Sequence, residues 1–443
     1  MTKTTTAEKL DFKKILPVFV IVLIDMLGLT IIIPLLPLYA TSFGATPLVV
    51  GVLGAMYPAF QFIAAPLLGR LSDRFGRRPI LLISQAGTFM GFLLLGLSHT
   101  LWILFLSRII DGISGANIST AQAVITDSTT EKTRTQGLGL IGAAFGLGFI
   151  VGPVIAFTVL ALSGSNYQLV AFVAAGFSLL SMALTWLWLD ETLPPEKRGH
   201  NIEKKALSLA VMFTALHRPV VGLLLALMFM QQFAFGTLQQ LLALFTLTRL
   251  GMGASSNAAL FVFVGILVVV VQGGLIGRWS RAYGERRLII MGLVVLGIGL
   301  ILTGLTPARP VPWYSQAVLT AELNAGRNLP GETPPVQAVP VALPQEGHNG
   351  WLGIVWLMVT MIPCAVGGGV LQPSINSLLT RKADPAEVGG MLGLSAAFLS
   401  GSNALTPLIM GAAFQWLGPS APFLLGGTLL LGLWVVALRG VKD

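Results

Sequence analysis

Charged residues are scarce in this chain. Asp, Glu, Lys and Arg make up 10% of its 443 residues, whereas a soluble domain usually carries about 25%. Hydrophobic residues reach 54%, and apolar runs recur along almost the whole length. This composition excludes an ordinary soluble protein and indicates an integral membrane protein.

Cysteine and histidine are also rare, and this limits the possible chemistry. The only cysteine, Cys364, cannot form an intramolecular disulfide, so we expect it to serve in packing. The four histidines are widely spaced: His99, His200, His217 and His348. No metal-ligand cluster, nucleophile with a base, or phosphate-binding loop is recognisable. We therefore expect no enzyme activity, no metal and no cofactor, and no transport powered by ATP within this chain.

The apolar runs are long enough to cross a hydrocarbon core of about 30 Å as helices. We predict an all-α fold with twelve transmembrane helices. Their approximate spans are 15–40, 47–68, 80–97, 101–124, 135–160, 166–189, 219–247, 256–276, 287–305, 351–379, 388–412 and 419–438. The first span is too long for a signal peptide and is expected to be retained.

The net charge of +9 follows the topology rather than nucleic-acid binding. With the N-terminus inside, 23 of the 27 Lys and Arg residues lie on the cytoplasmic side, as orientation in membranes requires. Arg249, Arg309 and Arg327 fall outside, and Arg108 lies within the membrane. We expect both termini in the cytoplasm and a plasma membrane location, with the bacterial inner membrane favoured.

An internal repeat divides the chain into two halves. The stretch GRLSDRFGRR at 69–78 matches GRWSRAYGER at 277–286 with a shift of 208 residues. A polar linker lies between the copies. We therefore predict two pseudo-symmetric six-helix halves, residues 1–189 and 218–443, joined by a cytoplasmic linker at 190–217.

A second match shows where the halves differ. GLGLIGAAFGLGFIVGP at 137–153 matches MLGLSAAFLSGSNALTP at 391–407 with a shift of 254, so the second half contains 254 − 208 = 46 additional residues. The proline-rich segment 306–350 is the predicted insertion, on the outer side. We expect a solvated loop there, with a lid or a partner-docking element as the alternative.

Several motifs together resemble the major facilitator superfamily. GRLSDRFGRRPILL resembles its loop signature between the second and third helices, RIIDGISGA its fourth-helix arginine motif, and GLGFIVGP its fifth-helix antiporter motif. With DMLGLTIIIPLLP in the first span, the chain looks most like the tetracycline-efflux and multidrug-proton antiporters of that superfamily. The resemblance covers the whole chain and implies the major facilitator fold.

The resemblance assigns a conformational latch to the first loop. Its residues are Gly69, Asp73, Arg74, Gly76, Arg77, Arg78 and Asp127. It implies that Asp73 faces the start of the eleventh span after Pro385, and that Arg77 meets Asp127. The second copy has Arg281 and Glu285 at the positions of Asp73 and Arg77, so we expect a one-sided latch. Plain topology charges are the alternative for both loops.

The fifth span contains Gly148, Gly152 and Pro153, which form the antiporter motif. Small residues let transmembrane helices approach closely, and proline bends a helix. The resemblance implies that this stretch packs against the second half and limits leak. Ordinary helix packing is the alternative.

Three ionisable residues, Asp25, Arg108 and Asp111, lie deep in the membrane. A rise of about 1.5 Å per residue places both carboxylates near the midplane. One arginine satisfies one carboxylate, so burial and like-charge repulsion favour a proton on the pair. We predict that both aspartates share Arg108 and carry the coupled proton. A structural salt bridge is the alternative.

The second half has no deep acid, whereas tetracycline-efflux proteins typically use further membrane acids, so a different substrate is favoured. Polar and aromatic side chains are candidates for a cavity that binds a large amphipathic molecule, with interhelical hydrogen bonds as the alternative. These residues are Gln61, Asn117, Gln122, Gln231, Gln232, Phe235, Gln239, Gln372 and Asn376.

The sequence therefore predicts a monomeric secondary transporter that exports an amphipathic organic compound or drug by alternating access. The proton gradient is the expected energy source, and the expected partners are the substrate, protons and membrane lipid, not nucleic acid. A proton-coupled lipid or nutrient carrier on the same fold is one alternative. A receptor or scaffold that does not transport is another.

Overall fold

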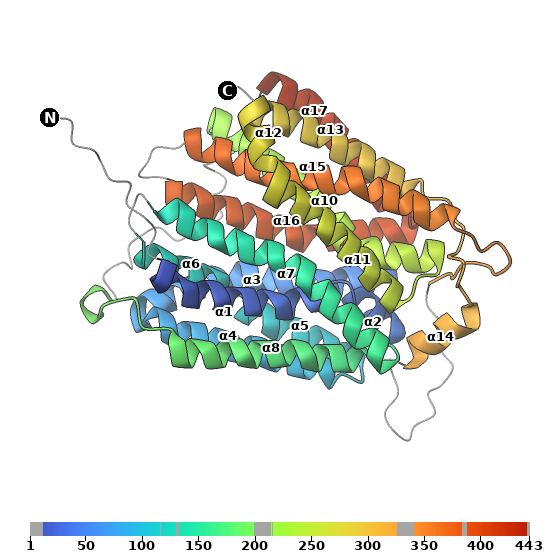
Figure 1. Cartoon of the computed structure of the whole chain (residues 1–443), viewed down its shortest axis with the longest axis horizontal. Coiled ribbons are helices and arrows are strands. Elements are labelled where there is room, and N and C mark those ends of the chain that lie inside the picture. The colour runs from blue at the N-terminus through green and yellow to red at the C-terminus, as the bar shows by residue number, and fades with distance from the viewer. Residues whose placement is uncertain are drawn as a thin grey trace.

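The computed structural model describes residues 12–115, 117–129, 133–198, 216–325, 341–382 and 388–440, together with Thr214. All regular elements in these ranges are helical (Figure 1). The first half contains α1 (Phe12–Ile32), α2 (Leu36–Ser42), α3 (Pro47–Phe75), α4 (Arg77–Gly96), α5 (Leu101–Ser114), α6 (Asn117–Asp127), α7 (Arg134–Ser163) and α8 (Tyr167–Trp188). The second half follows the short 3-10 helix η1 (Pro195–Lys197). It contains α10 (Pro219–Leu250), α11 (Ala254–Val269), the π-helix η2 (Val270–Leu275), α12 (Ile276–Tyr283), α13 (Glu285–Gly304), α14 (Gln316–Ala325), α15 (Leu352–Lys382), α16 (Val388–Leu417) and α17 (Ala421–Gly440).

Eleven helices in the described ranges are long and apolar enough to cross a bilayer. The predicted fourth span is divided into α5, of 14 residues, and α6, of 11. The break includes Gly115, and glycine lowers helix stability by about 1 kcal/mol relative to alanine. The two short helices together supply the twelfth crossing. The protein is therefore an all-α, multi-pass membrane protein.

The first predicted span is also interrupted, between α1 and α2. Pro34 lies in this interruption. Proline has no N–H to donate and its ring clashes with the carbonyl four residues earlier, so the helix ends before it. The chain turns at this point and α2 continues as a separate short helix.

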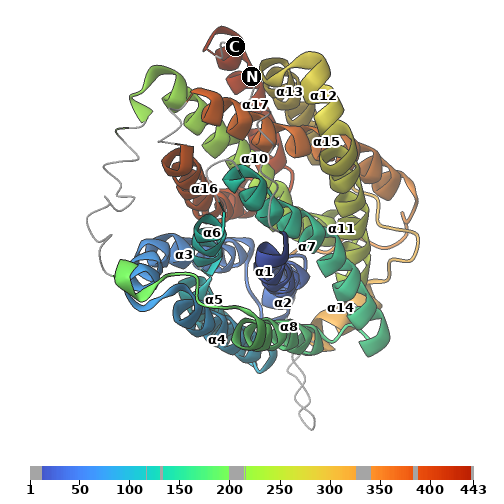
Figure 2. The same cartoon turned by 60° about the vertical axis from the view of Figure 1, so that its left-hand side comes forward.

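The two halves pack side by side, and two helix pairs supply most of the contact between them (Figure 2). α3 packs against α16, and α7 packs against α11. α1 begins and α17 ends on the left of Figure 1, whereas α14 lies on the right. We call these the termini end and the insertion end of the bundle.

The halves contact each other near the insertion end of α3 and α16. Gly51 of α3 lies against Pro407 and Gly411 of α16. The backbone N–H of Leu48 donates to Oε1 of Gln415 at 3.0 Å. These contacts close the insertion end in this conformation.

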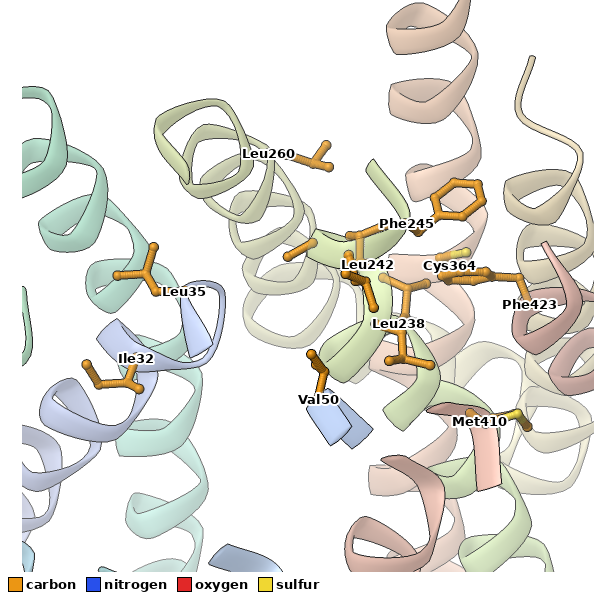
Figure 3. Packing of buried hydrophobic residues seen from close by; sticks show 14 of the residues in the cluster. Ile32, Leu35, Val50, Leu238, Leu242, Phe245, Leu260, Cys364, Met410 and Phe423 are labelled. Atoms are coloured by element: carbon orange, nitrogen blue, oxygen red, sulfur yellow. The ribbon is translucent and has the colours of Figure 1, made fainter. Parts of the chain in front are cut away.

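The largest hydrophobic cluster crosses the boundary between the halves (Figure 3). Ile32 and Val50 come from the first half, whereas Leu238 and Phe423 come from the second. Cys364 belongs to the same cluster and is 1% exposed, in agreement with the packing role expected for it.

The insertion is not simply a solvated loop. Its helix α14 buries Leu319 and Leu323 and packs against α2 of the first half. Burial of a leucine side chain contributes about 1.5–3 kcal/mol, which is enough to hold a short helix in place. On the other side, Oε1 of Glu322 accepts from the backbone N–H of Ala254 at 2.8 Å. α14 thus contacts both halves, and the expectation of a loop without packing was wrong for residues 316–325.

Candidate functional site

An ion pair is buried within the first half, on α5. Nη1 of Arg108 lies 3.0 Å from Oδ2 of Asp111, and the two side chains are 2% and 1% exposed. Their spacing of three residues places them on one helix face. The Arg108 guanidinium lies over the Phe92 ring of α4, 5.5 Å from its centroid. Gly91 of α4 allows this close approach, because a Cβ there would lie 2.8 Å from the Asp111 Cβ.

Asp25 of α1 is also buried, at 7% exposure, but it has a different partner. Its Oδ2 accepts from Nδ2 of Asn117, and the Arg108 guanidinium pairs with Asp111 instead. The prediction that both aspartates share Arg108 was therefore wrong for this conformation. The physical reason is the break after α5, which places Asn117 at the first turn of α6, beside α1.

Two side chains satisfy the carbonyl groups that this break exposes. Nε2 of Gln61 donates to the Gly115 carbonyl at 2.6 Å and also contacts the Tyr57 hydroxyl at 3.1 Å. The Ser84 hydroxyl donates to the Ser114 carbonyl. The last carbonyls of a helix lack partners within it, so such contacts stabilise the interruption. Gln61 thus supports the break, rather than simply lining a cavity.

A small pocket lies beside Asp25, among α1, α4 and α6. Its lining residues are Ile21, Val22, Asp25, Met26, Leu81, Gln85, Asn117 and Ala121. Gln85 was not among the residues predicted for the site. Gln85 lies on α4, eight residues after Arg77, and nothing in the sequence indicates that this position faces α1 and α6.

Two of the other predicted cavity residues make hydrogen bonds between helices of the second half. Nε2 of Gln232 donates to Oδ1 of Asn403 at 2.8 Å, and the Ser395 hydroxyl donates to Oδ1 of Asn376 at 2.8 Å. Gln231 is 1% exposed, and its Oε1 has no hydrogen-bond partner. The half-buried candidates are Gln122, Phe235, Gln239 and Gln372. Gln232 and Asn376 therefore act in helix packing in this conformation.

The loop between α3 and α4 is organised around Arg77. Nε of Arg77 lies 3.0 Å from Oδ2 of Asp127, as expected, and Nη1 of Arg77 lies 2.6 Å from Oδ1 of Asp73. Gly76 has φ of 107°, a conformation that favours glycine. Oε1 of Glu191 accepts from the Arg77 backbone N–H at 2.9 Å and so caps α4, a role that the sequence did not indicate.

The remaining latch residues lie around this centre. The Arg74 guanidinium lies over the Phe75 ring, 5.2 Å from its centroid, and that of Arg78 lies over Trp186 at 5.4 Å. A Cβ on Gly69 would meet nothing within 4 Å. The segment after Pro385 that Asp73 is predicted to face lies outside the described residues, so this contact stays a prediction.

The second half contains a counterpart of this arrangement with the charges exchanged. Nη2 of Arg381 lies 2.9 Å from Oε1 of Glu285. Glu285 corresponds to Arg77 at the shift of 208, and Arg381 corresponds to Asp127 at the shift of 254. The pattern extends to the serines: Nη1 of Arg77 donates to the Ser72 hydroxyl at 2.6 Å, and the Ser280 hydroxyl donates to Oε1 of Glu285 at 3.2 Å. Both halves therefore have an ion pair at this position. The one-sided latch between the halves stays a prediction.

The glycines of the antiporter motif face α1 of the same half. A Cβ on Gly148 would lie 3.1 Å from the Met26 Cβ, and one on Gly152 would lie 2.2 Å from Oγ1 of Thr30. Thr30 also donates to the Gly148 carbonyl at 2.8 Å. Pro153, the third motif residue, is buried. The glycines thus serve the contact between α7 and α1, whereas α7 as a whole also packs against α11 of the second half. The role of this stretch in limiting leak stays a prediction.

Comparison with known proteins gives the family. The sequence model of the Major Facilitator Superfamily matches residues 18–350. Tetracycline resistance protein, class B, from Escherichia coli is 27% identical over 418 residues, which cover 94% of this chain and 91% of that protein. Multidrug resistance protein 1 from Bacillus subtilis (strain 168) is 32% identical over 273 residues, which cover 61% of this chain and 68% of that protein.

A solved structure shows the same fold. The human organic anion transporter MFSD10 (TETRAN) matches with a TM-score of 0.65 and 23% identity, covering 97% of this chain and 100% of that chain. The relatives are transporters, not enzymes. The family match over most of the chain, the paired helical halves and the motif loop agree with one another, and the protein belongs to the major facilitator superfamily.

Proposed function

We propose that this protein is a proton-coupled exporter of an amphipathic organic compound, with Asp25 as the proton-carrying group. The observation that carries the proposal is the unequal pairing of the two deep aspartates. Asp111 has the Arg108 guanidinium at 3.0 Å, whereas Asp25 has only the neutral amide of Asn117. A buried carboxylate without a cation is costly in a membrane, and it becomes neutral by binding a proton.

The pairing also assigns different roles to the three buried charges. Arg108 and Asp111 neutralise each other, so neither needs to exchange a proton in order to stay buried. Asp25 lies beside a pocket, and its Oδ2 accepts from a neutral amide rather than from a guanidinium. Of the two predicted proton carriers, the geometry therefore favours Asp25.

The direction and the substrate class rest on the relatives and on the motifs. Relatives named for tetracycline and multidrug resistance support export of organic compounds. The second half has no acid in the middle of its helices, so we propose an amphipathic compound held mainly by apolar and amide contacts. Both termini face the cytoplasm in this proposal, and the insertion end faces outward.

Transport in proteoliposomes under an imposed pH gradient tests the proposal. Asp25→Asn keeps the shape of the side chain and its contact with Asn117 but cannot release a proton, so we expect loss of proton-driven transport with substrate binding retained. Asp190→Asn is the matched control, because Asp190 is exposed beyond the end of α8. Unchanged proton-driven transport by Asp25→Asn would refute the proposed role of this residue.

A panel that contains both drugs and lipids separates the proposed exporter from a lipid or nutrient carrier. Substrate-dependent proton movement with amphipathic drugs alone supports export of such compounds. The same movement with lipids alone would favour the carrier, and no movement with any compound would favour a receptor or scaffold.

A further inference from the structure

Two residues that line the pocket, Asp25 and Gln85, each have a side-chain oxygen without a hydrogen-bond partner. These atoms are Oδ1 of Asp25 and Oε1 of Gln85, and the residues are 7% and 0% exposed. Apart from Asn117, the other lining residues are apolar. A buried acceptor without a donor costs free energy, so this pair of acceptors requires an explanation.

The surrounding hydrogen bonds determine which end of the Gln85 amide faces away from Ser181. The Ser181 hydroxyl donates its only hydrogen to the Ile21 carbonyl at 3.3 Å. It must therefore accept from Gln85, whose Nε2 lies 2.7 Å from the Ser181 oxygen. Reversing the amide would place two acceptors against each other at Ser181, so Nε2 stays on Ser181 and Oε1 is the atom left without a partner.

The two amides that line the pocket with Asp25 then favour opposite charge states of its carboxyl group. Asn117 donates to Oδ2 and stabilises the carboxylate. Oε1 of Gln85 can only accept, so it disfavours a charged oxygen and favours a protonated one that donates a hydrogen. A pocket of this kind suits either a direct contact or one bridging water.

We propose that Gln85 is a positioning residue for proton uptake, whose Oε1 accepts the hydrogen of protonated Asp25 directly or through one water. The inference rests on the proposed role of Asp25 in proton coupling. When Asp25 binds a proton, the O–H bond forms at Oδ1 and its hydrogen is donated to Gln85. When the proton leaves, the carboxylate keeps only the contact with Asn117.

The other titratable groups near Asp25 are few among the described residues. Asp111 and Tyr57 interact with it electrostatically, and Arg108 is paired with Asp111. The helices that pack on α1 are α6, α7 and α8, and each carries its charged or titratable residue at one end of the helix. These residues are Asp127, Arg134 and Tyr167. Gln85 is therefore the neutral group best placed to favour protonated Asp25.

α4 holds Gln85 rigidly because it packs tightly on its neighbours. A Cβ on Gly87 would lie 1.9 Å from Oγ of Ser114, and one on Gly91 would lie 2.8 Å from the Asp111 Cβ. The Ser178 hydroxyl also donates to the Gln85 backbone carbonyl at 3.3 Å. The same helix thus contacts the surroundings of both aspartates, with Gln85 at one and Gly91 at the other.

The test compares Gln85→Leu and Ser181→Ala with Gln168→Leu, a matched control on α8 outside the site. Gln85→Leu removes the acceptor. Ser181→Ala keeps the Gln85 side chain but lets the Gln85 amide reverse and present Nε2 to Asp25. An effect of Ser181→Ala therefore cannot come from a loss of packing at position 85. We expect the pH at half-maximal proton-driven transport to fall by about one unit in both variants, which corresponds to a roughly tenfold weaker proton affinity. The same pH should stay unchanged in the control.

Infrared difference spectroscopy of the purified protein gives a readout that does not depend on transport. The carbonyl band of protonated Asp25, identified by its loss in Asp25→Asn, should move to higher frequency in Gln85→Leu because the carboxyl loses its acceptor. An unchanged band and an unchanged pH midpoint in both variants would overturn the role of Gln85. If no such band exists and Asp25→Asn transports normally, the proposed function itself fails.

Discussion

Adding one methyl group at Gly51 of α3 should shift the equilibrium between the conformation with the insertion end closed and the conformation with it open. A Cβ on Gly51 would lie 2.1 Å from the Pro407 carbonyl oxygen and 3.1 Å from the Gly411 Cα. Ordinary contacts between nonbonded carbon and oxygen atoms are more than about 3 Å, so Gly51→Ala requires α3 and α16 to separate by roughly 1 Å at the insertion end.

The expected magnitude follows from this overlap. Inserting a methyl group into a packed contact costs about 1–3 kcal/mol when neighbours must shift. In alternating access the contact is present only while the insertion end is closed, so this cost acts on one conformation. A difference of 1–3 kcal/mol changes the ratio of two conformations by about 5–150-fold.

Distance measurements between spin labels test this prediction. Cysteines at His99, in the exposed loop between α4 and α5, and at Leu417, which is 69% exposed at the end of α16, report the separation of the halves. The native Cys364 is buried and need not be replaced. We expect Gly51→Ala to shift the distance distribution toward longer values in the absence of substrate.

Gly176→Ala on α8 is the matched control, because a Cβ there would meet nothing within 4 Å. It should leave the distribution unchanged. Equal distributions for Gly51→Ala and the control, with both proteins folded, would show that the contact between α3 and α16 does not control the insertion end.

Two further predictions concern the charged contacts outside the membrane interior. Asp127→Ala should lower the free energy of unfolding by about 1–3 kcal/mol, because it removes a charged hydrogen bond of Arg77, which is 9% exposed. Arg381→Ala should lower it by less than about 1 kcal/mol, because Arg381 is 65% exposed. Thermal unfolding in detergent measures both changes, and equal losses would contradict the greater contribution of the buried pair. Burial raises the pKa of Glu322 above its ordinary value of 4.5, against the opposing hydrogen bonds from Ala254 and Ser165. The bound proton therefore favours docked α14, and this stabilisation is present below about pH 4.5 and is lost as the pH rises through the raised pKa. Hydrogen exchange in residues 316–325 should show this pH dependence, Glu322→Gln should remove it, and equal profiles for the two proteins would contradict it.

The amino-acid sequence by itself determined the membrane class, the number of crossings, the two halves and the family. These properties depend on local hydropathy, on the placement of Lys and Arg, and on motifs that are continuous in the chain. It also identified the three buried charges, because ionisable residues are conspicuous inside apolar runs. The contact between Arg77 and Asp127 followed from the resemblance.

Only the tertiary structure decided which of these groups meet. The interruption at Gly115 moves Asn117 to Asp25 and leaves Arg108 to Asp111, an outcome that helical periodicity over 101–124 does not reveal. Glu285 and Arg381 match Arg77 and Asp127 at two different shifts, because the insertion lies between Glu285 and Arg381. The exchange of charge between the two halves is therefore hidden in the sequence and follows from the ion pair in the structure. Gln85 is one amide among many in the sequence. It became part of the site only because α4 packs between α5 and α8, and contacts between helices depend on folded geometry rather than on the local order of residues.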